Sequence, residues 1–310
     1  MDRNLRKTVH DFCSASNRPD MLPAMASKPK IAIVGPGRLG RALAIELSRA
    51  GCVVSEIVSR NRPASRRTGQ KLARMLHAQA TVLANAVLDA DIVWFCVLDR
   101  EIATAAEIFS RFVWKGKAAF HSSGALRSDE LRVLRRRGAA VASVHPLMTF
   151  VSGAMPSLRG VPFALEGDAA ALRVAHRIVR KLGGEPFIIR DKDKVAYHAW
   201  GAFTSPLLVA LLVSAEQVAR AAGLSIAQAR KRMMPIVIQT IANYGRLGPA
   251  GAFSGPLIRG DVEIVRRHLK VLRKVPEARN AYLALVSVAL RHLPVQQRRQ
   301  LQRALQLSAK

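Results

Sequence analysis

Short apolar runs alternate with helical patterns along the first two thirds of the chain. The runs are rich in Val, Ile, Ala and Phe, as is typical of buried strands. We expect strands at 30–34, 51–58, 81–83, 91–97, 118–121, 140–144, 161–165 and 186–189. Strands that alternate with helices predict an α/β fold with a doubly wound parallel sheet, whose ligands bind beyond the carboxyl ends of the strands. We place this sheet domain at residues 29–190.

The rest of the chain, residues 191–310, has helical periodicity and predicts an all-helical C-terminal domain. Its first helix begins at the capping residues Asp191 and Asp193 and runs to about Ala222. The stretch 199–215 carries no charge, but it is short for a membrane span and contains Gly, Thr, Ser and Pro. We therefore interpret it as a core helix or a dimer seam and expect no membrane partner. Further helices are expected at 225–244, 262–274, 276–292 and 295–307, with a glycine- and proline-rich segment at 245–260.

Residues 1–28 follow neither period. They mix basic and acidic residues and lack the apolar centre of a secretory signal, so we expect a disordered leader and a cytoplasmic protein. The cysteines, Cys13, Cys52 and Cys96, are too few and too scattered for a disulfide framework or a thiolate metal site, and we expect no metal.

The charge of the chain is large but evenly spread. Lys and Arg number 49 against 21 Asp and Glu, which gives a net charge of +28. Such a charge is typical of proteins that bind nucleic acid, an anionic membrane or an anionic small molecule. However, the basic residues form no compact block, and aromatic residues, which would stack on bases, make up only 5%. We therefore interpret most of the charge as solvated surface and expect no specific nucleic-acid partner.

A glycine-rich turn, Gly-Pro-Gly-Arg-Leu-Gly, lies between the first strand and the first helix. Gly35 suits the tight turn, Gly37 lets backbone N–H groups approach a pyrophosphate, and Gly40 lets the helix pack close to the strand. The helix N-terminus adds a favourable dipole for an anion. In this strand–turn–helix context the spacing predicts a dinucleotide-binding loop, to which Arg38 and Leu39 also belong. A glycine turn without a ligand is the alternative.

The end of the second strand indicates which dinucleotide binds. The chain continues there as Ser59-Arg60-Asn61-Arg62, without the acidic residue that usually binds the ribose of NAD. A hydroxyl and a guanidinium suit the 2′-phosphate of NADP(H), because Arg offers a bidentate, charge-assisted fork. We predict NADP(H) as cofactor, bound by Ser59, Arg60 and Arg62; the alternative is that these arginines are only solvated. Val97 and Leu98 begin the loop that would pass the nicotinamide ribose.

Two histidines follow strand ends in equivalent positions. One opens the sequence His121-Ser122-Ser123-Gly124, and the other is His145, which precedes a proline. Both places lie at the ligand-binding edge of a doubly wound sheet. We therefore expect Ser122, Ser123 and His145 to line a substrate pocket, although each histidine could equally be a hydrogen-bonding residue of its loop.

Lys194 and His198 are four residues apart, which places both on one face of the helix that follows the domain junction. A cleft is expected at such a junction. Either side chain could donate a proton to a carbonyl or imine while hydride arrives. The alternative is a solvated lysine and a hydrogen-bonded helix histidine.

Several of these motifs together resemble those of a bacterial family. The family joins a Rossmann-like N-terminal domain to a C-terminal domain of unknown function, number 2520. The motifs are Gly35–Gly40, His121-Ser-Ser-Gly124, Val144-His-Pro146, Lys194-x-x-Tyr197-His198 and Gly255-Pro-x-x-Arg259-Gly-Asp261, and the resemblance covers residues 29–305. The family is similar to a branch of the 6-phosphogluconate and 3-hydroxyacid dehydrogenase superfamily, related to ketopantoate and pyrroline-5-carboxylate reductases. The resemblance implies NADP-linked oxidoreduction and a homodimer formed through the helical domain.

The resemblance carries some residue roles and not others. In the hydroxyacid dehydrogenases a Lys after the domain junction is followed four residues later by an Asn. Lys194 matches that Lys, whereas His198 occupies the Asn position, so only the Lys role is implied. The serine–glycine substrate loop of the superfamily corresponds loosely to residues 122–124. Where the narrower family has Ser-Asn in the long helix, this chain has Ser205-Pro206, so any contact of that Asn is lost.

Taken together, the residues and the resemblance predict an NADP(H)-dependent oxidoreductase. Its substrate would be a small, anionic carbonyl compound, hydroxy acid or imine. Lys194 would orient or protonate the substrate with help from His198, and Ser122, Ser123 and His145 would line the pocket. The alternative is a non-catalytic NADP-binding sensor or interaction protein, which keeps the glycine loop but lacks productive chemistry.

Overall fold

The computed structural model describes residues 28–307 and divides into two compact units, Met1–Gly201 and Ala202–Lys310. The expected leader, 1–28, lies outside the described residues except for Lys28. The sequence places the domain boundary at 190/191, and the compact units separate later, inside a helix. The exact limits of the domains stay a prediction.

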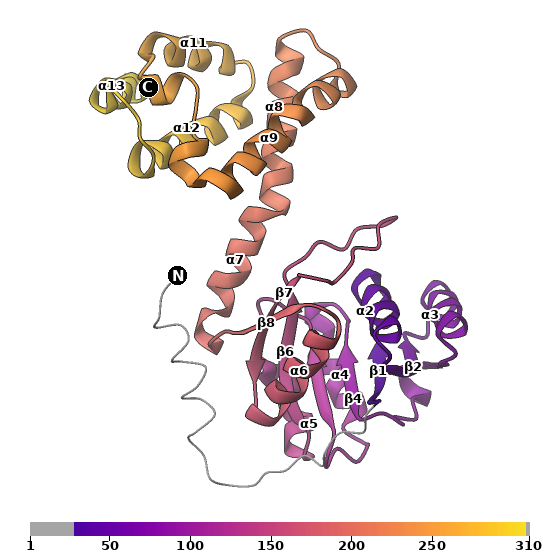
Figure 1. Ribbon diagram of the computed structural model, residues 1–310. Helices are drawn as coiled ribbons and strands as arrows, with labels where there is room; N and C mark the ends of the chain where they lie inside the picture. Colours follow the sequence, from indigo (N-terminus) through magenta and orange to yellow (C-terminus); the bar gives the residue numbers. More distant parts are fainter. Residues whose placement is uncertain (1–27, 308–310) are drawn as a thin grey trace. The chain divides into compact units, whose positions relative to one another are not determined.

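The first unit is built on a sheet of eight strands (Figure 1), and each predicted strand is present. Their order across the sheet is β3-β2-β1-β4-β5-β6-β7-β8. The strands are β1 (Lys30–Val34), β2 (Val53–Ser59), β3 (Gln79–Val82), β4 (Ile92–Phe95), β5 (Ala118–His121), β6 (Ala140–Pro146), β7 (Pro162–Gly167) and β8 (Glu185–Ile188).

The winding of the sheet reverses at β1, which pairs in parallel with both β2 and β4. Ligands of doubly wound sheets bind at such a reversal. The predicted doubly wound parallel sheet is confirmed, with one departure: β7 runs antiparallel to β6. Parallel neighbours need a crossover, usually helical, and the connection 147–161 contains no helix, so the chain returns in the opposite direction.

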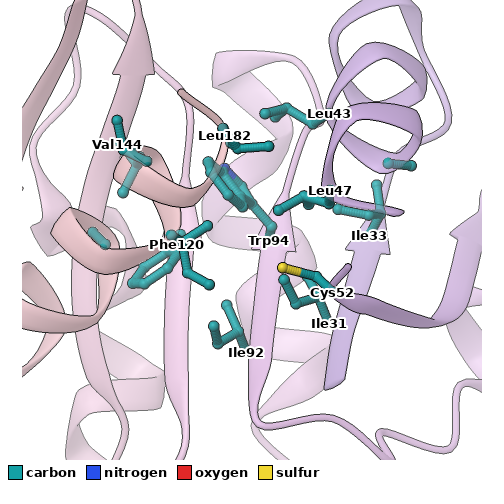
Figure 2. Close-up of a cluster of buried hydrophobic side chains, with 14 of the residues drawn as sticks. Ile31, Ile33, Leu43, Leu47, Cys52, Ile92, Trp94, Phe120, Val144 and Leu182 are labelled. Atoms are coloured by element: carbon teal, nitrogen blue, oxygen red, sulfur yellow. The ribbon is translucent and has the colours of Figure 1, made fainter. Parts of the chain in front are cut away.

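Helices cover both faces of the sheet. They are α2 (Arg38–Arg49), α3 (Pro63–Leu76), α4 (Ile102–Phe109), α5 (Arg132–Arg136) and α6 (Ala169–Lys181). Strand β1 shows why both faces are buried: Ile31 and Ile33 enter one hydrophobic cluster, and Ala32 and Val34 enter the other. The first cluster, drawn in Figure 2, joins Trp94 and Phe120 of the sheet to helices α2 and α6. The second packs the sheet against α4 and α5.

The second unit is helical, as predicted. Helix α7 (Lys194–Thr204) begins in the first unit and ends in the second. It is followed by α8 (Pro206–Ala221), α9 (Ile226–Ala252), α10 (Pro256–Arg259), α11 (Val262–Leu272), α12 (Pro276–His292) and α13 (Arg298–Leu307). A small core of Val265, Leu269, Val286, Leu290 and Leu301 joins α11, α12 and α13.

Two predicted helix boundaries are wrong. The single helix expected over 191–222 is broken at Ser205, whose φ of −130° and ψ of −84° are not helical. The break falls before Pro206, which lacks an N–H group and disfavours a helical residue before it. The helix expected to end at residue 244 extends to a kink at Gly248, whose φ of 72° and ψ of 179° are not helical, and a short helical segment follows to Ala252. Glycine tolerates that conformation, which explains why a glycine-rich segment can stay largely helical.

One helical stretch among the described residues, Asp191–Ala221, is long and apolar enough to cross a membrane by length and composition alone. Only 6% of its most apolar window is buried. Apolar side chains such as Leu207, Val209 and Val213 are exposed on α8. An exposed apolar helix of this kind is shared by membrane spans and by helices that pack against a partner.

Candidate functional site

The glycine loop is shaped by close backbone contacts. Gly35 has a φ of +101°, and a Cβ on it would come within 2.7 Å of the carbonyl oxygen of Cys96. A Cβ on Gly40 would come within 2.1 Å of the carbonyl oxygen of Gly35. Gly37 differs, because a Cβ there would meet nothing within 4 Å. The first and third glycines are therefore needed by the fold itself, whereas the middle one borders open space.

The N-terminus of α2 opens onto that space. Gly37 is the N-cap residue and supplies no side-chain hydrogen bond, so the first backbone N–H groups of the helix stay free of a side-chain cap. The first helical residue, Arg38, is exposed, and Leu39 is half-buried. A basic residue at a helix N-terminus opposes the helix dipole unless an anion is bound there. The loop therefore suits a phosphate group.

The residues after β2 differ in their exposure and in their hydrogen-bond partners. The Ser59 hydroxyl is buried and donates to the carbonyl oxygen of Thr81 at 3.2 Å, so it already has a partner in the sheet. The guanidinium of Arg60 pairs with Glu101 at 2.9 Å. Arg62 is exposed at the N-cap of α3. Arg60 and Arg62 are thus exposed basic groups directly after β2.

The loop after β4 lies between the glycine loop and the substrate loop. Val97 contacts Gly35, since its Cγ1 would lie 3.0 Å from a Cβ on that glycine. Leu98 is half-exposed and leads into the 3₁₀ helix η2 (Asp99–Glu101). The Asp99 carboxylate accepts a hydrogen bond of 2.8 Å from the hydroxyl of Ser123, so this loop is joined to the one that follows β5.

The predicted substrate loop, 121–124, is held by its own hydrogen bonds. Nδ1 of His121 accepts the backbone N–H of Ser123, so its Nε2 donates to the carbonyl oxygen of Arg127. Burial lowers the pKa of His121 to about 4, which keeps it neutral. His121 is therefore a hydrogen-bonding residue of the loop. The hydroxyl of Ser122 accepts a hydrogen bond from Nε1 of Trp94 at 2.8 Å.

Lys194 is completely buried, so the interpretation of it as a solvated lysine is wrong. Its Nζ donates to Oγ of Ser143 at 2.7 Å and to the carbonyl oxygen of Ser123 at 3.3 Å. The Ser143 hydroxyl donates to the same carbonyl oxygen at 2.9 Å. Burial lowers the pKa of Lys194 to about 8, although the charges of Glu166 and Asp99 oppose this. A lysine with such a pKa can exchange a proton near neutral pH.

Two histidines lie against Gly124. A Cβ on this glycine would come within 2.9 Å of Nε2 of His145 and within 2.8 Å of Cδ2 of His198. The centroids of the two imidazole rings are 6.4 Å apart. Nδ1 of His145 shares a 2.8 Å hydrogen bond with the hydroxyl of Tyr197. Burial, together with the charges of Lys194 and His198, lowers the pKa of His145 to about 4.

The structure thus brings four predicted residues together around the substrate loop: Lys194, His198, Ser123 and His145. Ser122 belongs to the same loop, but its hydroxyl faces Trp94. The prediction of pocket residues omitted Ser143 and Tyr197. The sequence does carry weak signals for both. Ser143 precedes His145 by two residues and shares its face of β6, and Tyr197 lies one turn after Lys194 on α7.

Within residues 28–307, no cluster of three or more His, Cys, Asp or Glu side chains could hold a metal ion.

A glycine turn at the point where a doubly wound sheet reverses, with an open helix N-terminus, defines a dinucleotide-binding fold.

The chain matches two known domain families. Residues 16–146 match the Rossmann-like domain, and residues 161–288 match the domain of unknown function DUF2520. The chain is therefore a Rossmann-like protein with a C-terminal DUF2520 domain, which confirms the family that its motifs resemble. A search of curated protein sequences gave no significant match.

Solved structures share the fold. Protein TM1727 from Thermotoga maritima has a TM-score of 0.67 and 22% identity, covering 90% of this chain and 100% of its own. BF3122 from Bacteroides fragilis, described as a candidate NADP oxidoreductase, has a TM-score of 0.67 and 22% identity, with 83% and 96% covered. A reductive aminase from Aspergillus terreus, solved with NADPH and ethyl-5-oxohexanoate, has a TM-score of 0.59 and 18% identity, with 86% and 94% covered. At these identities the likeness confirms the predicted fold.

Proposed function

We propose that this protein is an NADP(H)-dependent oxidoreductase that acts on a small carbonyl compound, hydroxy acid or imine. The observation that carries the proposal is the buried amine of Lys194, held by Ser123 and Ser143 at the carboxyl ends of β5 and β6. These strands end at the same edge of the sheet as β1, where the glycine loop begins. A proton-exchanging group and a dinucleotide loop at one sheet edge suit hydride transfer.

The cofactor proposal rests on the open helix N-terminus and the basic residues after β2. The backbone N–H groups that follow Gly37 would bind the pyrophosphate, with Arg38 beside them. Arg60 and Arg62 would bind the 2′-phosphate, and Val97 and Leu98 would lie along the nicotinamide ribose. Leu39 and Gly40 shape the loop, and Ser59 supports the end of β2 through its bond to the sheet. NADPH, once bound, supplies the hydride.

Lys194 would orient the substrate and protonate it, assisted by His198. A lysine ammonium has three N–H donors, and two of them are used within the described part of the chain, by Ser123 and Ser143. The third would bind the substrate oxygen or nitrogen. When hydride adds to the substrate carbon, the π electron pair of the C=O or C=N bond moves to the oxygen or nitrogen, and that atom takes a proton from Lys194. Positioned proton donors contribute about 10²–10⁴-fold to such rates.

The test is a screen for NADPH oxidation with small 2-oxo acids, aldehydes and cyclic imines. We expect turnover of at least one compound, a loss of about 10²–10⁴-fold in kcat for Lys194→Ala, and a smaller loss for His198→Ala. Lys192→Ala is the matched control, because that lysine is exposed and lies two residues earlier in the chain, in the 3₁₀ helix (Asp191–Asp193) before α7. Undiminished turnover in both site variants would overturn the assignment of Lys194 and His198. NADPH binding without oxidation of NADPH by any compound in the panel would favour the alternative, a non-catalytic NADP-binding sensor.

We further propose that the chain forms a homodimer through the helical unit and works in the cytoplasm, without a nucleic-acid or membrane partner. The exposed apolar side chains of α8 support the dimer, because burying them against a second copy removes apolar surface from water.

A further inference from the structure

Tyr197 and His145 form a hydrogen-bonded pair that the proposed function does not use. The Tyr197 side chain is buried on α7, and its hydroxyl lies 2.8 Å from Nδ1 of His145 on β6. The two rings meet edge to face, with centroids 5.5 Å apart and planes at 88°. This contact and the hydrogen bond together hold the imidazole in one orientation.

The direction of this hydrogen bond follows from the chemistry of the phenol. Burial raises the pKa of Tyr197 to about 12, so the side chain keeps its O–H at neutral pH. Nδ1 of His145 is the acceptor that the described residues offer to this hydroxyl. If Nδ1 carried a proton instead, the buried O–H would lose that acceptor, which costs about 1–3 kcal/mol. Tyr197 therefore donates and Nδ1 accepts.

The proton of His145 then lies on Nε2. The imidazole is neutral near pH 7, because burial and the neighbouring charges of Lys194 and His198 lower its pKa to about 4. A neutral imidazole carries a single N–H, and Nδ1 is already an acceptor. Within the described part of the chain, Nε2 makes no hydrogen bond. It remains a free donor.

The free donor lies beside Gly124, at the substrate loop. A Cβ on Gly124 would come within 2.9 Å of Nε2 and within 2.8 Å of Cδ2 of His198. Both distances are shorter than real Cβ contacts allow, so glycine keeps the space between the two rings open. The same loop holds Ser123, whose carbonyl oxygen binds Lys194.

We propose that Tyr197 is a positioning residue, which fixes His145 as a neutral Nε2–H donor that binds the acceptor atom of the substrate. This inference rests on the proposed reduction and narrows its substrate class to ketones, aldehydes and neutral imines. An iminium ion is excluded, because its nitrogen has no lone pair to accept the hydrogen bond. The donor strengthens its bond as negative charge develops on the acceptor atom during hydride transfer.

His145 and Lys194 have different roles in the hydride-transfer step. Hydride from NADPH forms the new C–H bond, and the π electron pair of the C=O or C=N bond moves to the oxygen or nitrogen. His145 stabilises that atom by a hydrogen bond and keeps its own proton. The proton that completes the product comes from Lys194, and NADP⁺ is released.

The first test reads the tautomer directly. Long-range ¹H–¹⁵N spectra of the full-length protein with labelled histidine should show the His145 proton on Nε2 at pH 7. Tyr197→Phe keeps the ring and removes the hydroxyl, so it should give a mixture of the two tautomers. Tyr282→Phe is the matched control: Tyr282 bonds Nδ1 of His268 at 3.2 Å in the helical unit, so only the His268 signals should change. A proton on Nδ1, a doubly protonated ring, or His145 signals unaltered in Tyr197→Phe would each overturn the proposal.

The second test reads the reaction. With pyruvate, glyoxylate or 2-methyl-1-pyrroline as substrate, Tyr197→Phe should lower kcat/KM about tenfold, as expected for one hydrogen bond, and leave the Kd for NADPH unchanged. His145→Gln retains an N–H donor and should keep more activity than His145→Phe. The N-methyl iminium salt of the same pyrroline should not be reduced. Rapid reduction of that salt, or full activity of Tyr197→Phe, would contradict this inference alone, whereas no turnover of any compound would contradict the proposed function and the inference with it.

Discussion

Nζ of Lys194 lies 2.7 Å from Oγ of Ser143, and both groups donate to the carbonyl oxygen of Ser123. The Ser143 hydroxyl thus donates a hydrogen bond to a backbone oxygen, and its own oxygen accepts a hydrogen bond from the lysine. The arrangement stabilises the charged form of an amine that burial would otherwise neutralise.

Removing the Ser143 hydroxyl should therefore make Lys194 more acidic. In Ser143→Ala the ammonium loses an acceptor, so its pKa should fall below the value of about 8 in the native protein. We expect the alkaline limb of the pH–rate profile for NADPH oxidation to move to lower pH. Ser214→Ala removes an exposed hydroxyl that bonds only within its own helix, and it should leave the profile in place. A profile unchanged in Ser143→Ala would show that Lys194 does not set that limb.

Lys194 should also make the stability of the fold depend on pH. Its pKa falls from 10.5 to about 8 on folding, so the unfolded chain binds a proton that the folded protein has released. The free energy of unfolding should rise between about pH 8 and pH 10.5, by on the order of 3 kcal/mol. Urea unfolding of the native protein and of Lys194→Met across this range isolates the effect, because the other titrating groups are common to both. If the free energy of unfolding of the two proteins changed with pH in parallel, the lowered pKa of Lys194 would be contradicted.

Glu101 should weaken the affinity for NADP⁺. Its carboxylate pairs with Arg60 at 2.9 Å and competes with a 2′-phosphate for that guanidinium. Glu101→Gln should tighten the binding of NADP⁺ several-fold and leave NAD⁺ unchanged, whereas Arg60→Ala should weaken NADP⁺ selectively. Arg49→Ala is the control, because Arg49 forms an equivalent surface pair with Glu46 at the other end of α2. Calorimetry measures the Kd of each variant for NADP⁺ and NAD⁺. Equal effects on both cofactors would contradict the assignment of Arg60 to the 2′-phosphate.

The glycines of the loop should separate folding from cofactor binding. Gly37→Ala meets no protein atom, so the variant should fold normally and lose affinity for NADPH, because the new methyl group occupies the pyrophosphate path. Gly40→Ala meets backbone at 2.1 Å and should lose about 1–3 kcal/mol of stability. Gly245→Ala, in an open position of α9, should alter neither property unfavourably. Thermal unfolding with and without NADPH measures both quantities, and normal NADPH binding by Gly37→Ala would exclude this loop as the cradle.

The exposed face of α8 should hold two copies of the chain together. Val209 is 59% exposed, and a glutamate in its place would bury a charge in the expected interface. Light scattering should give a dimer for the native chain and a monomer for Val209→Glu. Val113→Glu, at a site 77% exposed in the sheet unit, should remain a dimer. A monomeric native chain that floats with phospholipid vesicles would instead identify Asp191–Ala221 as a membrane segment.

The sequence predicts the sheet well because its strands are buried on both faces and appear as apolar runs such as Ile31–Val34. The direction of β7 could not be predicted this way, since it depends on whether the preceding connection forms a helix. The break at Ser205 had a local signal in Pro206, which favours a helix start over a helix interior.

The site was only partly predictable for a different reason. Spacing places Lys194 and His198 on one helical face, but their burial differs completely, because the lysine enters a contact with Ser143 on a distant strand. The proposed role of Tyr197 likewise depends on its hydrogen bond to His145, which lies 52 residues away in the sequence. Ser59, which was predicted from its position at a strand end, has a hydroxyl that donates to the carbonyl oxygen of Thr81, a contact that the sequence did not indicate.

Ser123 links two loops of the site. Its side chain is hydrogen-bonded to Asp99, in the loop that follows β4 and contacts the glycine turn, and its backbone carbonyl is hydrogen-bonded to Lys194. A shift of either loop therefore alters the geometry of the other. Occupancy at one end of the sheet edge should change affinity at the other end by a common factor, since such coupling is reciprocal. Cofactor and substrate would then each alter the binding of the other, whichever of the two binds first.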